Sequence, residues 1–167
     1  HFDPAGSQER KIVLNPDQDI DYIYQALYYG TKYFLASIGM KKVVIGLSGG
    51  IDSAVNACLY REVLGAENVL LVNMPSIYNS ETTKNLAAKL ARNLGCLYAI
   101  MPIQESVDLT VRQLEETPVT NLAAGKTTYI KVSSFNKENI QARDRSARIL
   151  AALAASFGGG FTCNANK

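Results

Sequence analysis

A short turn concentrates residues that could bind phosphate, Gly46-Leu47-Ser48-Gly49-Gly50-Ile51-Asp52-Ser53. It follows the apolar run Val43–Ile45 and precedes a helix-like segment, whose unpaired N–H groups and dipole favour an anion. The paired glycines let the backbone approach a ligand closely, and Ser48 and Ser53 add hydroxyl donors. Asp52 would repel phosphate oxygens unless a cation lies between them, and Mg²⁺ commonly bridges carboxylates and phosphates. The turn therefore predicts a nucleotide site with a magnesium ligand at Asp52.

Two familiar phosphate loops do not fit this turn. A Walker loop needs a lysine after its last glycine, and the dinucleotide fingerprint needs a different glycine spacing. The string S-G-G-x-D-S instead resembles the pyrophosphate loop (PP-loop) of ATP pyrophosphatases, which split ATP between its α- and β-phosphates and transfer AMP to an oxygen. The alternative is an ordinary turn with Asp52 or Ser53 as a helix N-cap. We predict catalytic roles for Ser48, Asp52 and Ser53, within an ATP-binding loop that comprises Gly46, Leu47, Ser48, Gly49, Gly50, Ile51, Asp52 and Ser53.

A second cluster lies in the segment 138–148, where Arg143, Arg145 and Arg148 fall in the first turns of a helix expected over Ile140–Phe157. Cations at a helix start oppose the helix dipole. A nearby anion would explain them, because guanidinium suits phosphate and carboxylate. The alternative is a solvated face with local pairs to acids of the same segment.

The elements that must position these residues alternate between strand and helix. Apolar runs without polar alternation predict strands at Val43–Leu47, Asn68–Asn73, Leu97–Ile103 and Phe161–Asn164. Helical spacing predicts helices from Asp17, over Ile51–Leu64, from Ser80 to about Leu94 with Asn79 or Ser80 as N-cap, over Gln104–Glu116 and over Ile140–Phe157. This order predicts an α/β fold, a doubly wound parallel sheet with helices on both faces. Ligands of such sheets bind beyond the carboxyl ends of the strands.

We divide the chain into a lead-in or linker, 1–16, and one synthetase-type domain, 17–167. Thr117–Asn139 interrupts the alternation, and a functional lid and a disordered surface loop remain equal alternatives. Tyrosines of the first helix (Tyr22, Tyr24, Tyr28, Tyr29 and Tyr33) are interpreted as core or subunit contacts. The chain lacks an initial Met and stops directly after an apolar segment, so we expect a fragment whose C-terminal part is missing.

Composition narrows the classes of function. The 167 residues carry a net charge of +2, so the chain has no strong bulk attraction to nucleic acid or to a membrane, and no apolar run approaches the ~20 residues of a spanning helix. Its three cysteines, Cys58, Cys96 and Cys163, lack metal spacing and predict buried free thiols in a reducing cytoplasm. The single histidine, His1, is terminal. Chemistry must therefore rest on cations, carboxylates, backbone dipoles and Mg²⁺.

Four blocks together resemble NAD synthetase, and most closely the synthetase domain of its glutamine-dependent form. They are 44–54, Met74-Pro75-Ser76, Glu138–Arg143 and Asn166-Lys167, and the resemblance extends from about residue 10 to the end. It implies an adenine nucleotide alpha-hydrolase-like fold and an ATP-dependent amidation. Deamido-NAD and ATP would give an adenylated intermediate and pyrophosphate, and ammonia would then displace AMP. The resemblance also implies a glutaminase domain that draws ammonia from glutamine, and a homodimer or larger assembly.

The resemblance assigns roles by position. The Ser48–Ser53 loop would hold the ATP phosphates, with Asp52 as the Mg²⁺ ligand. Two asparagines, Asn73 and Asn79, would shape the ATP pocket. Deamido-NAD would be bound by Asn139, Arg143, Arg145 and Lys167. The chain departs from the family pattern at Asn164 and Ala165, where a threonine and a glycine are common, and the family continues after the lysine with further substrate and metal contacts.

Two other classes of function remain open. Another PP-loop ATP pyrophosphatase, such as a GMP synthetase or a tRNA-modifying enzyme, would carry the same S-G-G-x-D-S string. A non-catalytic nucleotide-binding module on the same fold would keep the loop without turnover. Glu138–Arg143 argues against GMP synthesis, and the cysteine spacing and modest charge argue against tRNA modification.

Overall fold

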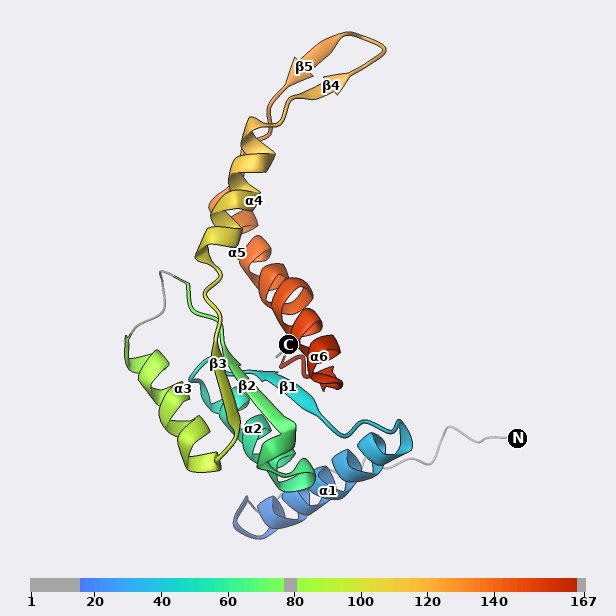
Figure 1. Ribbon diagram of the computed structural model, residues 1–167, viewed down its shortest axis with the longest axis vertical. Coiled ribbons are helices and arrows are strands. Elements are labelled where there is room, and N and C mark those ends of the chain that lie inside the picture. The colour runs from blue at the N-terminus through green and yellow to red at the C-terminus, as the bar shows by residue number, and fades with distance from the viewer. Residues whose placement is uncertain (1–15, 77–80, 165–167) are drawn as a thin grey trace, which may run out of the picture.

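Four parallel strands form the central sheet of the computed structural model, which describes residues 16–76 and 81–164 (Figure 1). The sheet order is β3-β2-β1-β6. Val43 pairs with Val69 on one side and with Gly160 on the other, and Leu70 pairs with Leu97. The strands are β1 (Val43–Gly46), β2 (Val69–Asn73), β3 (Leu97–Ile100) and β6 (Gly160–Phe161). A purely parallel sheet requires helical crossovers between consecutive strands.

Helices cover both faces of this sheet, as the sequence predicts (Figure 1). Val43 and Ile45 pack with α2 and α3, whereas Val44 between them packs with α4, η2 and α6. Alternate side chains of β1 thus enter two separate cores, which explains its uninterrupted apolar sequence. The helices are α1 (Pro16–Ser37), α2 (Ile51–Leu64), the short 3₁₀ helix η1 (Ala66–Asn68), α3 (Glu81–Leu94), α4 (Gln104–Glu116), α5 (Ser134–Arg143), the π-helix η2 (Asp144–Leu150) and α6 (Ala151–Phe157).

Most predicted boundaries hold within a few residues. The predicted helices over 51–64 and 104–116 are confirmed, and Gly65, with φ +86°, ends the first of them. The third strand ends at Ile100, and Ile103 instead opens α4 as a buried residue. The fourth strand comprises Gly160–Phe161, earlier than predicted. The N-cap predicted at Asn79 or Ser80 lies outside the described residues.

The long C-terminal helix begins earlier than the sequence indicated. Ser133 is the N-cap of α5, and its side chain accepts a hydrogen bond of 3.2 Å from the N–H of Asn136. The helix then continues through η2 into α6. The predicted start at Ile140 is therefore wrong, and so is the placement of Arg143 and Arg145 in its first turns. These cations lie in the middle of the helix and do not oppose its dipole there.

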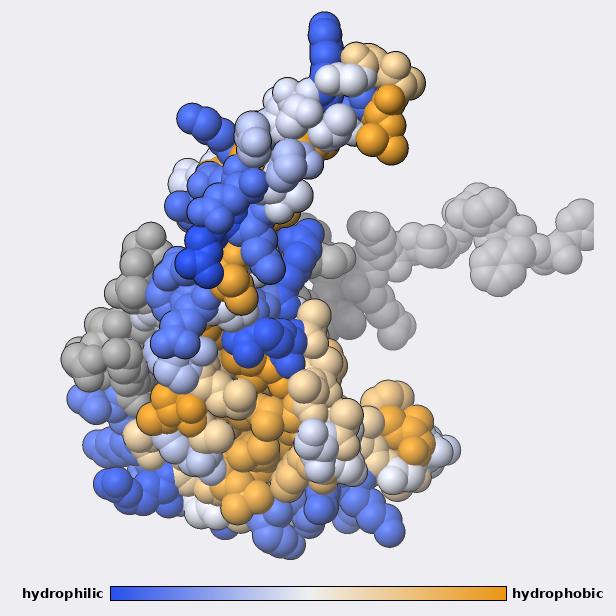
Figure 2. Space-filling view, turned by 45° about the horizontal axis from the view of Figure 1, so that its top comes forward, coloured by the Kyte–Doolittle hydropathy of each residue, from blue (hydrophilic) through white to orange (hydrophobic). Residues whose placement is uncertain are grey.

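The segment between α4 and α5 is folded, so the alternative of a disordered surface loop over Thr117–Asn139 is wrong, whereas a functional lid stays a prediction. It forms an antiparallel hairpin of β4 (Val119–Asn121) and β5 (Lys126–Thr128). The Asn121 side chain accepts hydrogen bonds of 3.0 Å from the N–H groups of Ala123 and Ala124, and Gly125 adopts φ +63°. With α4 and α5 the hairpin makes an arm that projects from the sheet (Figure 1). Apolar surface gathers at the end of this mostly hydrophilic arm (Figure 2).

The first helix lies against α2, and Leu35 is its buried anchor. The hydroxyl of Tyr24 donates to the Glu62 carboxylate, and this bond raises the pKa of Tyr24 to about 12. Tyr22, Tyr29 and Tyr33 are 76%, 63% and 79% exposed, so they do not belong to the core of this chain, and the alternative of a subunit contact stays a prediction. They form an exposed aromatic face instead.

Two findings bear on the prediction of a reducing cytoplasmic location: the state of the cysteines and the search for membrane-spanning helices. The cysteines carry free thiols, as predicted, but Cys58 and Cys96 are only half-buried and Cys163 is exposed, so the prediction that all three are buried is wrong. Within residues 16–76 and 81–164, no helix has both the length and the apolar character that a membrane span requires.

Candidate functional site

The serine- and glycine-rich loop leaves the carboxyl end of β1 and leads directly into α2. Two hydrogen bonds fix its first residue to the neighbouring strand. The N–H of Leu47 donates to the Val72 carbonyl at 2.8 Å, and the Asn73 side-chain amide donates to the Leu47 carbonyl at 3.1 Å. Leu47 and Asn73 are 1% and 5% exposed. The loop therefore starts from a rigid part of the sheet, at the edge where parallel sheets bind ligands.

Serine hydroxyls hold the loop in shape. The Ser53 hydroxyl donates to the Gly50 carbonyl at 3.0 Å and accepts from the Ser48 N–H at 3.3 Å. Its single proton is thus engaged, so in the 3.2 Å contact between the two hydroxyls Ser48 is the donor. The Ser48 oxygen accepts from the Gly50 N–H at 3.2 Å. Gly49 adopts φ +86°, a conformation that glycine allows at little cost.

The helix start differs from an ordinary capped turn. Gly50 is the N-cap of α2, and it has no side chain with which to cap the helix. The alternative of Asp52 or Ser53 as N-cap is therefore wrong. Ser53 is 4% exposed and directs its hydroxyl back into the loop, whereas Asp52 is exposed at the helix start. Asp52 and Ser53 of the first turn line the cavity beside the helix, and a helix N-terminus without a side-chain cap suits an anion.

A cavity of about 320 Å³ lies beside this loop and is lined by four separate parts of the chain. They are the loop, the end of β2, the π-helix η2 and the residues after β6. The lining residues are Gly46, Leu47, Ser48, Asp52, Ser53, Val72, Asn73, Met74, Arg145 and Asn164. The structure thus brings together seven predicted site residues: Gly46, Leu47, Ser48, Asp52, Ser53, Asn73 and Arg145. The other loop residues, Gly49, Gly50 and Ile51, shape the turn without lining the cavity.

Arg145 supplies a positive charge opposite the loop. It is half-buried in η2, and its Nε lies 3.4 Å from the Met74 carbonyl, to which it donates. Burial lowers the pKa of the Arg145 guanidinium, while Asp144 opposes that shift. Arginine stays protonated in proteins despite such shifts. The cavity therefore has an open helix N-terminus on one side and a fixed cation on another.

The other predicted substrate residues lie elsewhere. Arg143 is exposed, and its Nη1 donates to the backbone carbonyl and side-chain oxygen of Asn139 at 3.3 and 3.2 Å. The Asn139 amide donates to the Phe135 carbonyl at 3.1 Å. These two residues lie on α5 and do not line the cavity. Asn79 and Lys167 lie outside the described residues.

A second cavity of about 300 Å³ adjoins the first and shares Gly46, Met74, Arg145 and Asn164 with it. Its remaining lining residues are Ala142, Ser146, Leu150, Phe161, Thr162 and Cys163. The Thr162 hydroxyl is buried there and makes no hydrogen bond within the described part of the chain. Sequence reasoning missed Thr162 and the Met74 carbonyl. The signal for Thr162 was its place directly after a strand, at the same edge as the loop.

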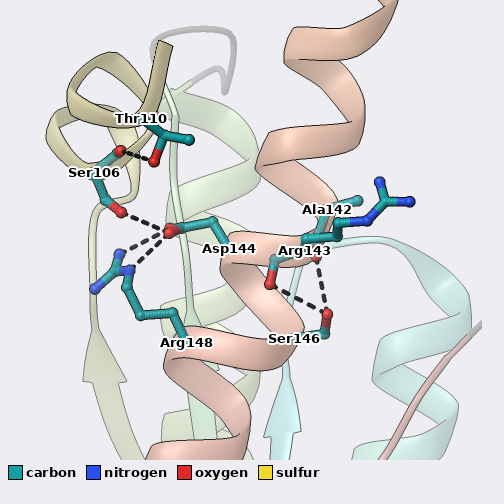
Figure 3. Close-up of polar contacts among 7 residues, drawn as sticks. All are labelled: Ser106, Thr110, Ala142, Arg143, Asp144, Ser146 and Arg148. Atoms are coloured by element: carbon teal, nitrogen blue, oxygen red, sulfur yellow. Dashed lines mark hydrogen bonds and ion pairs between the residues drawn. The ribbon is translucent and has the colours of Figure 1, made fainter. Parts of the chain in front are cut away.

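An acidic network beside Arg145 was also missed. Asp144 accepts bonds of 2.7 and 2.8 Å from Nε and Nη2 of Arg148, and one of 2.6 Å from the Ser106 hydroxyl of α4 (Figure 3). The Arg148 hydrogen bond is the main reason why the pKa of Asp144 is lowered; Ser106 acts in the same direction, and desolvation acts against both. The sequence signal was the spacing of four residues between Asp144 and Arg148, which places them on one helix face.

Asp52 is the candidate metal ligand of the cavity. No group of three or more histidine, cysteine, aspartate or glutamate side chains that could hold a metal occurs in residues 16–76 and 81–164. A single carboxylate beside a phosphate-binding loop fits Mg²⁺, which keeps several waters and is bound through one or two carboxylates and substrate phosphates. The donors present therefore suit magnesium that arrives with a nucleotide.

Comparison with known proteins gives consistent matches. The family model described as NAD synthase matches residues 23–159. The glutamine-dependent NAD(+) synthetase of Rhodobacter capsulatus is 36% identical over 155 residues, which are 93% of this chain and 26% of that protein. The enzyme of the same name from Thermotoga maritima is 36% identical over 159 residues, 95% of this chain and 24% of that one.

Solved structures agree with these sequence matches. Glutamine-dependent NAD+ synthetase from Acinetobacter baumannii in complex with ADP superposes with a TM-score of 0.74 and 32% identity, over 87% of this chain and 26% of that one. The NH3-dependent NAD synthetase of Campylobacter jejuni gives a TM-score of 0.70 with 27% identity, over 88% and 57%. This chain thus spans about a quarter of the length of the curated relatives that it matches.

Proposed function

Since the chain belongs to the NAD synthase family, we propose that it is the ATP-handling part of a ligase that converts deamido-NAD to NAD. A carboxylate oxygen of deamido-NAD attacks the α-phosphorus of ATP, and the bond to the β-phosphate breaks to release pyrophosphate. Ammonia then attacks the adenylated carbonyl carbon, loses a proton and displaces AMP. By similarity to relatives named glutamine-dependent, glutamine is the proposed source of ammonia, through a glutaminase domain.

The observation that carries this proposal is the shared cavity of the Ser48–Ser53 loop and Arg145. The first step brings two anions together, so its main obstacle is charge. The N-terminus of α2 would bind the phosphates, the serine hydroxyls would hold the loop in the shape that this requires, and Arg145 would offset the charge of the incoming carboxylate. The carboxylate is already a nucleophile and needs no general base. This accounts for a site without histidine among its lining residues.

Magnesium is part of the same proposal. Asp52 would hold Mg²⁺ together with the ATP phosphates, and the ion would neutralise charge that builds up on the leaving pyrophosphate. The ADP bound in the Acinetobacter baumannii structure supports an adenine nucleotide as the ligand of this fold.

Several earlier expectations stay predictions. They are contacts of Asn139, Arg143 and Lys167 with deamido-NAD, the role of Asn79 at the ATP pocket, the domain division at 16 and 17, a homodimer or larger assembly, and a cytoplasmic location.

Pyrophosphate release tests the proposed function. With ATP, Mg²⁺ and ammonium, we expect release that deamido-NAD stimulates. Asp52→Asn should abolish it, because the carboxylate that holds the metal is gone, while Asp108→Asn, an exposed carboxylate on α4, serves as the matched control. Arg145→Ala should raise the KM for deamido-NAD more than the KM for ATP, because Arg145 is assigned to the incoming anion.

Three outcomes would contradict parts of this proposal. Release stimulated by xanthosine monophosphate instead of deamido-NAD would identify a GMP synthetase-like enzyme. ATP binding without release for any acceptor would identify a nucleotide-binding module. Equal losses for both substrates in Arg145→Ala would remove the assignment of Arg145 to deamido-NAD.

A further inference from the structure

The helix that carries Arg145 changes its hydrogen-bonding pattern at the cavity. Asp144–Leu150 is π-helical, and the N–H of Ala151 donates to the Ser146 carbonyl, five residues earlier. The flanking residues Arg143 and Ala151 keep α-helical dihedral angles, so the helix is continuous from α5 through η2 to α6. Isolated π-turns are rare and often lie at functional sites. This turn changes the directions of the side chains around it.

Three consecutive side chains, from the last residue of α5 to the second residue of the π-helical turn, point in different directions. Arg143 points away from Asp144 (Figure 3). It bonds back to Asn139 of its own helix. Asp144 points toward α4, where it meets Ser106. Arg145 points into the nucleotide cavity and reaches the Met74 carbonyl. A small rotation of the helix would therefore move Arg145 out of the cavity.

The Asp144 carboxylate is anchored from two sides. Arg148 binds both of its oxygens, and Ser106 binds one of them at 2.6 Å. The Asp144 side chain is only 8% exposed, so water competes weakly for these bonds. Ser106 is itself fixed, because Val107 beside it is 2% exposed in the core and the Thr110 hydroxyl donates to the Ser106 carbonyl at 2.9 Å (Figure 3). The opposite face of the turn is buried through Ile149, which is 1% exposed.

We infer that Asp144 is a positioning residue for the reaction: its bonds to Ser106 and Arg148 fix the rotation of the π-helical turn and thereby hold Arg145 toward the substrate. Because α4 and α5 also form the projecting arm, the same bond couples that arm to the cavity. The part that concerns the substrate rests on the proposed function. The part that concerns the direction of Arg145 does not.

The direction of Arg145 can be measured in the ligand-free protein. The Nε–Hε signal of Arg145, assigned by its loss in Arg145→Lys, reports the side-chain environment by NMR. We expect this signal to shift and broaden in Asp144→Asn and Ser106→Ala, to recover in Ser106→Thr, which keeps the hydroxyl, and to stay unchanged in the control Asp108→Asn. An unchanged Arg145 signal in a folded Asp144→Asn protein would overturn the inference whether or not the enzyme makes NAD.

Kinetics test the consequence for the substrate. Asp144→Asn should raise the KM for deamido-NAD about tenfold, because misplacing a positioning group by a fraction of an ångström is costly, and Ser106→Ala should raise it less. The KM for ATP should change less than about twofold. In an Arg145→Ala background, adding Asp144→Asn should have no further effect on the KM for deamido-NAD, because Asp144 acts through Arg145.

Independent losses in that double variant would show that Asp144 supports only the fold, and would overturn the inference. If Asp144→Asn does not fold, the comparison of Ser106→Ala with Ser106→Thr decides the question by the same two measurements. If the wild-type protein shows no release of pyrophosphate with deamido-NAD, the proposed function fails, and the NMR comparison still decides the role of Asp144.

Discussion

Replacing the buried serine of the phosphate loop should cost more stability than replacing the exposed one. Ser53 and Ser48 undergo the same change to alanine, but Ser53 is 4% exposed and Ser48 is exposed. Loss of the Ser53 hydroxyl removes the acceptor of the Ser48 N–H and the donor to the Gly50 carbonyl. A typical internal hydrogen bond contributes about 1 kcal/mol net. We expect Ser53→Ala to lower the free energy of unfolding by about 2 kcal/mol.

Ser48→Ala should cost about 0.5 kcal/mol, because water replaces the partners of an exposed hydroxyl. The assay is urea unfolding with the slope m checked for constancy, so that a shift in midpoint reports stability alone. Ser37→Ala is the control away from the loop: its hydroxyl is exposed and donates to the Phe34 carbonyl at the end of α1.

Ligand binding provides the second half of this test. Because Ser53 holds the loop in its folded shape, Ser53→Ala should also reduce the rise in unfolding free energy that saturating ATP and Mg²⁺ produce. Equal stability losses for Ser48→Ala and Ser53→Ala would refute the argument from burial. An unchanged stabilisation by ATP in Ser53→Ala would show that the loop shape does not depend on the serine network.

Three further changes give independent checks. Gly49→Ala places a side chain at φ +86°, so the free energy of unfolding should fall by about 1–2 kcal/mol. ATP should also bind more weakly in a titration. An unchanged free energy of unfolding and an unchanged ATP affinity would mean that the loop relaxes without cost. Asp144→Asn should cost about 2 kcal/mol at pH 7. The folded-state pKa of Asp144 lies below its unfolded value, chiefly because of the Arg148 hydrogen bond. This stabilisation is therefore present above pH ~4 and is lost as the pH falls through the folded-state pKa. A difference in unfolding free energy between wild type and Asp144→Asn that stays constant down to pH 3 would contradict this account. Leu71→Ala, at a residue 0% exposed in β2, should cost about 2–5 kcal/mol in urea unfolding, whereas a loss below about 1 kcal/mol would mean that the core collapses around the vacancy.

The central layers of the fold were predictable because burial on both faces leaves a plain sequence signal. Val43–Ile45 and Val69–Val72 have no polar alternation, and both become interior strands. Glycine at position 65 marks the end of α2 by its positive φ, which other residues adopt at a cost. The loop between these elements was predictable as a phosphate site because its chemistry is local in sequence.

The arm was not predictable by the same reasoning, since it buries little. The first residues of α5, from Ser134 to Asn139, contain few apolar side chains, so helical periodicity does not reveal them. The N-cap Ser133 was a usable signal that was passed over. In the hairpin, every residue of β4 and β5 is exposed. The Asn121 turn chemistry, and not a hydrophobic pattern, determines that structure.

The site was only partly predictable because its parts come from distant segments. Arg145 reaches the cavity and Arg143 does not, although both belong to the same basic cluster. The distinction depends on the direction of each side chain on a π-helical turn, and sequence spacing based on an α-helix does not describe that turn.

The position of β1 between β2 and β6 has a consequence for how the molecule opens. Amide hydrogens of an interior strand exchange with solvent mainly when the whole domain unfolds, whereas those of an exposed hairpin exchange through local opening. Backbone amides of Val44 and Ile45 should therefore be among the slowest to exchange, and those of Thr127 and Thr128 among the fastest. The predicted ATP loop would then follow directly from the strand whose amides exchange most slowly. The hairpin at the end of the arm would open locally many times between two events of global unfolding, although Asp144 connects that arm to the ATP cavity.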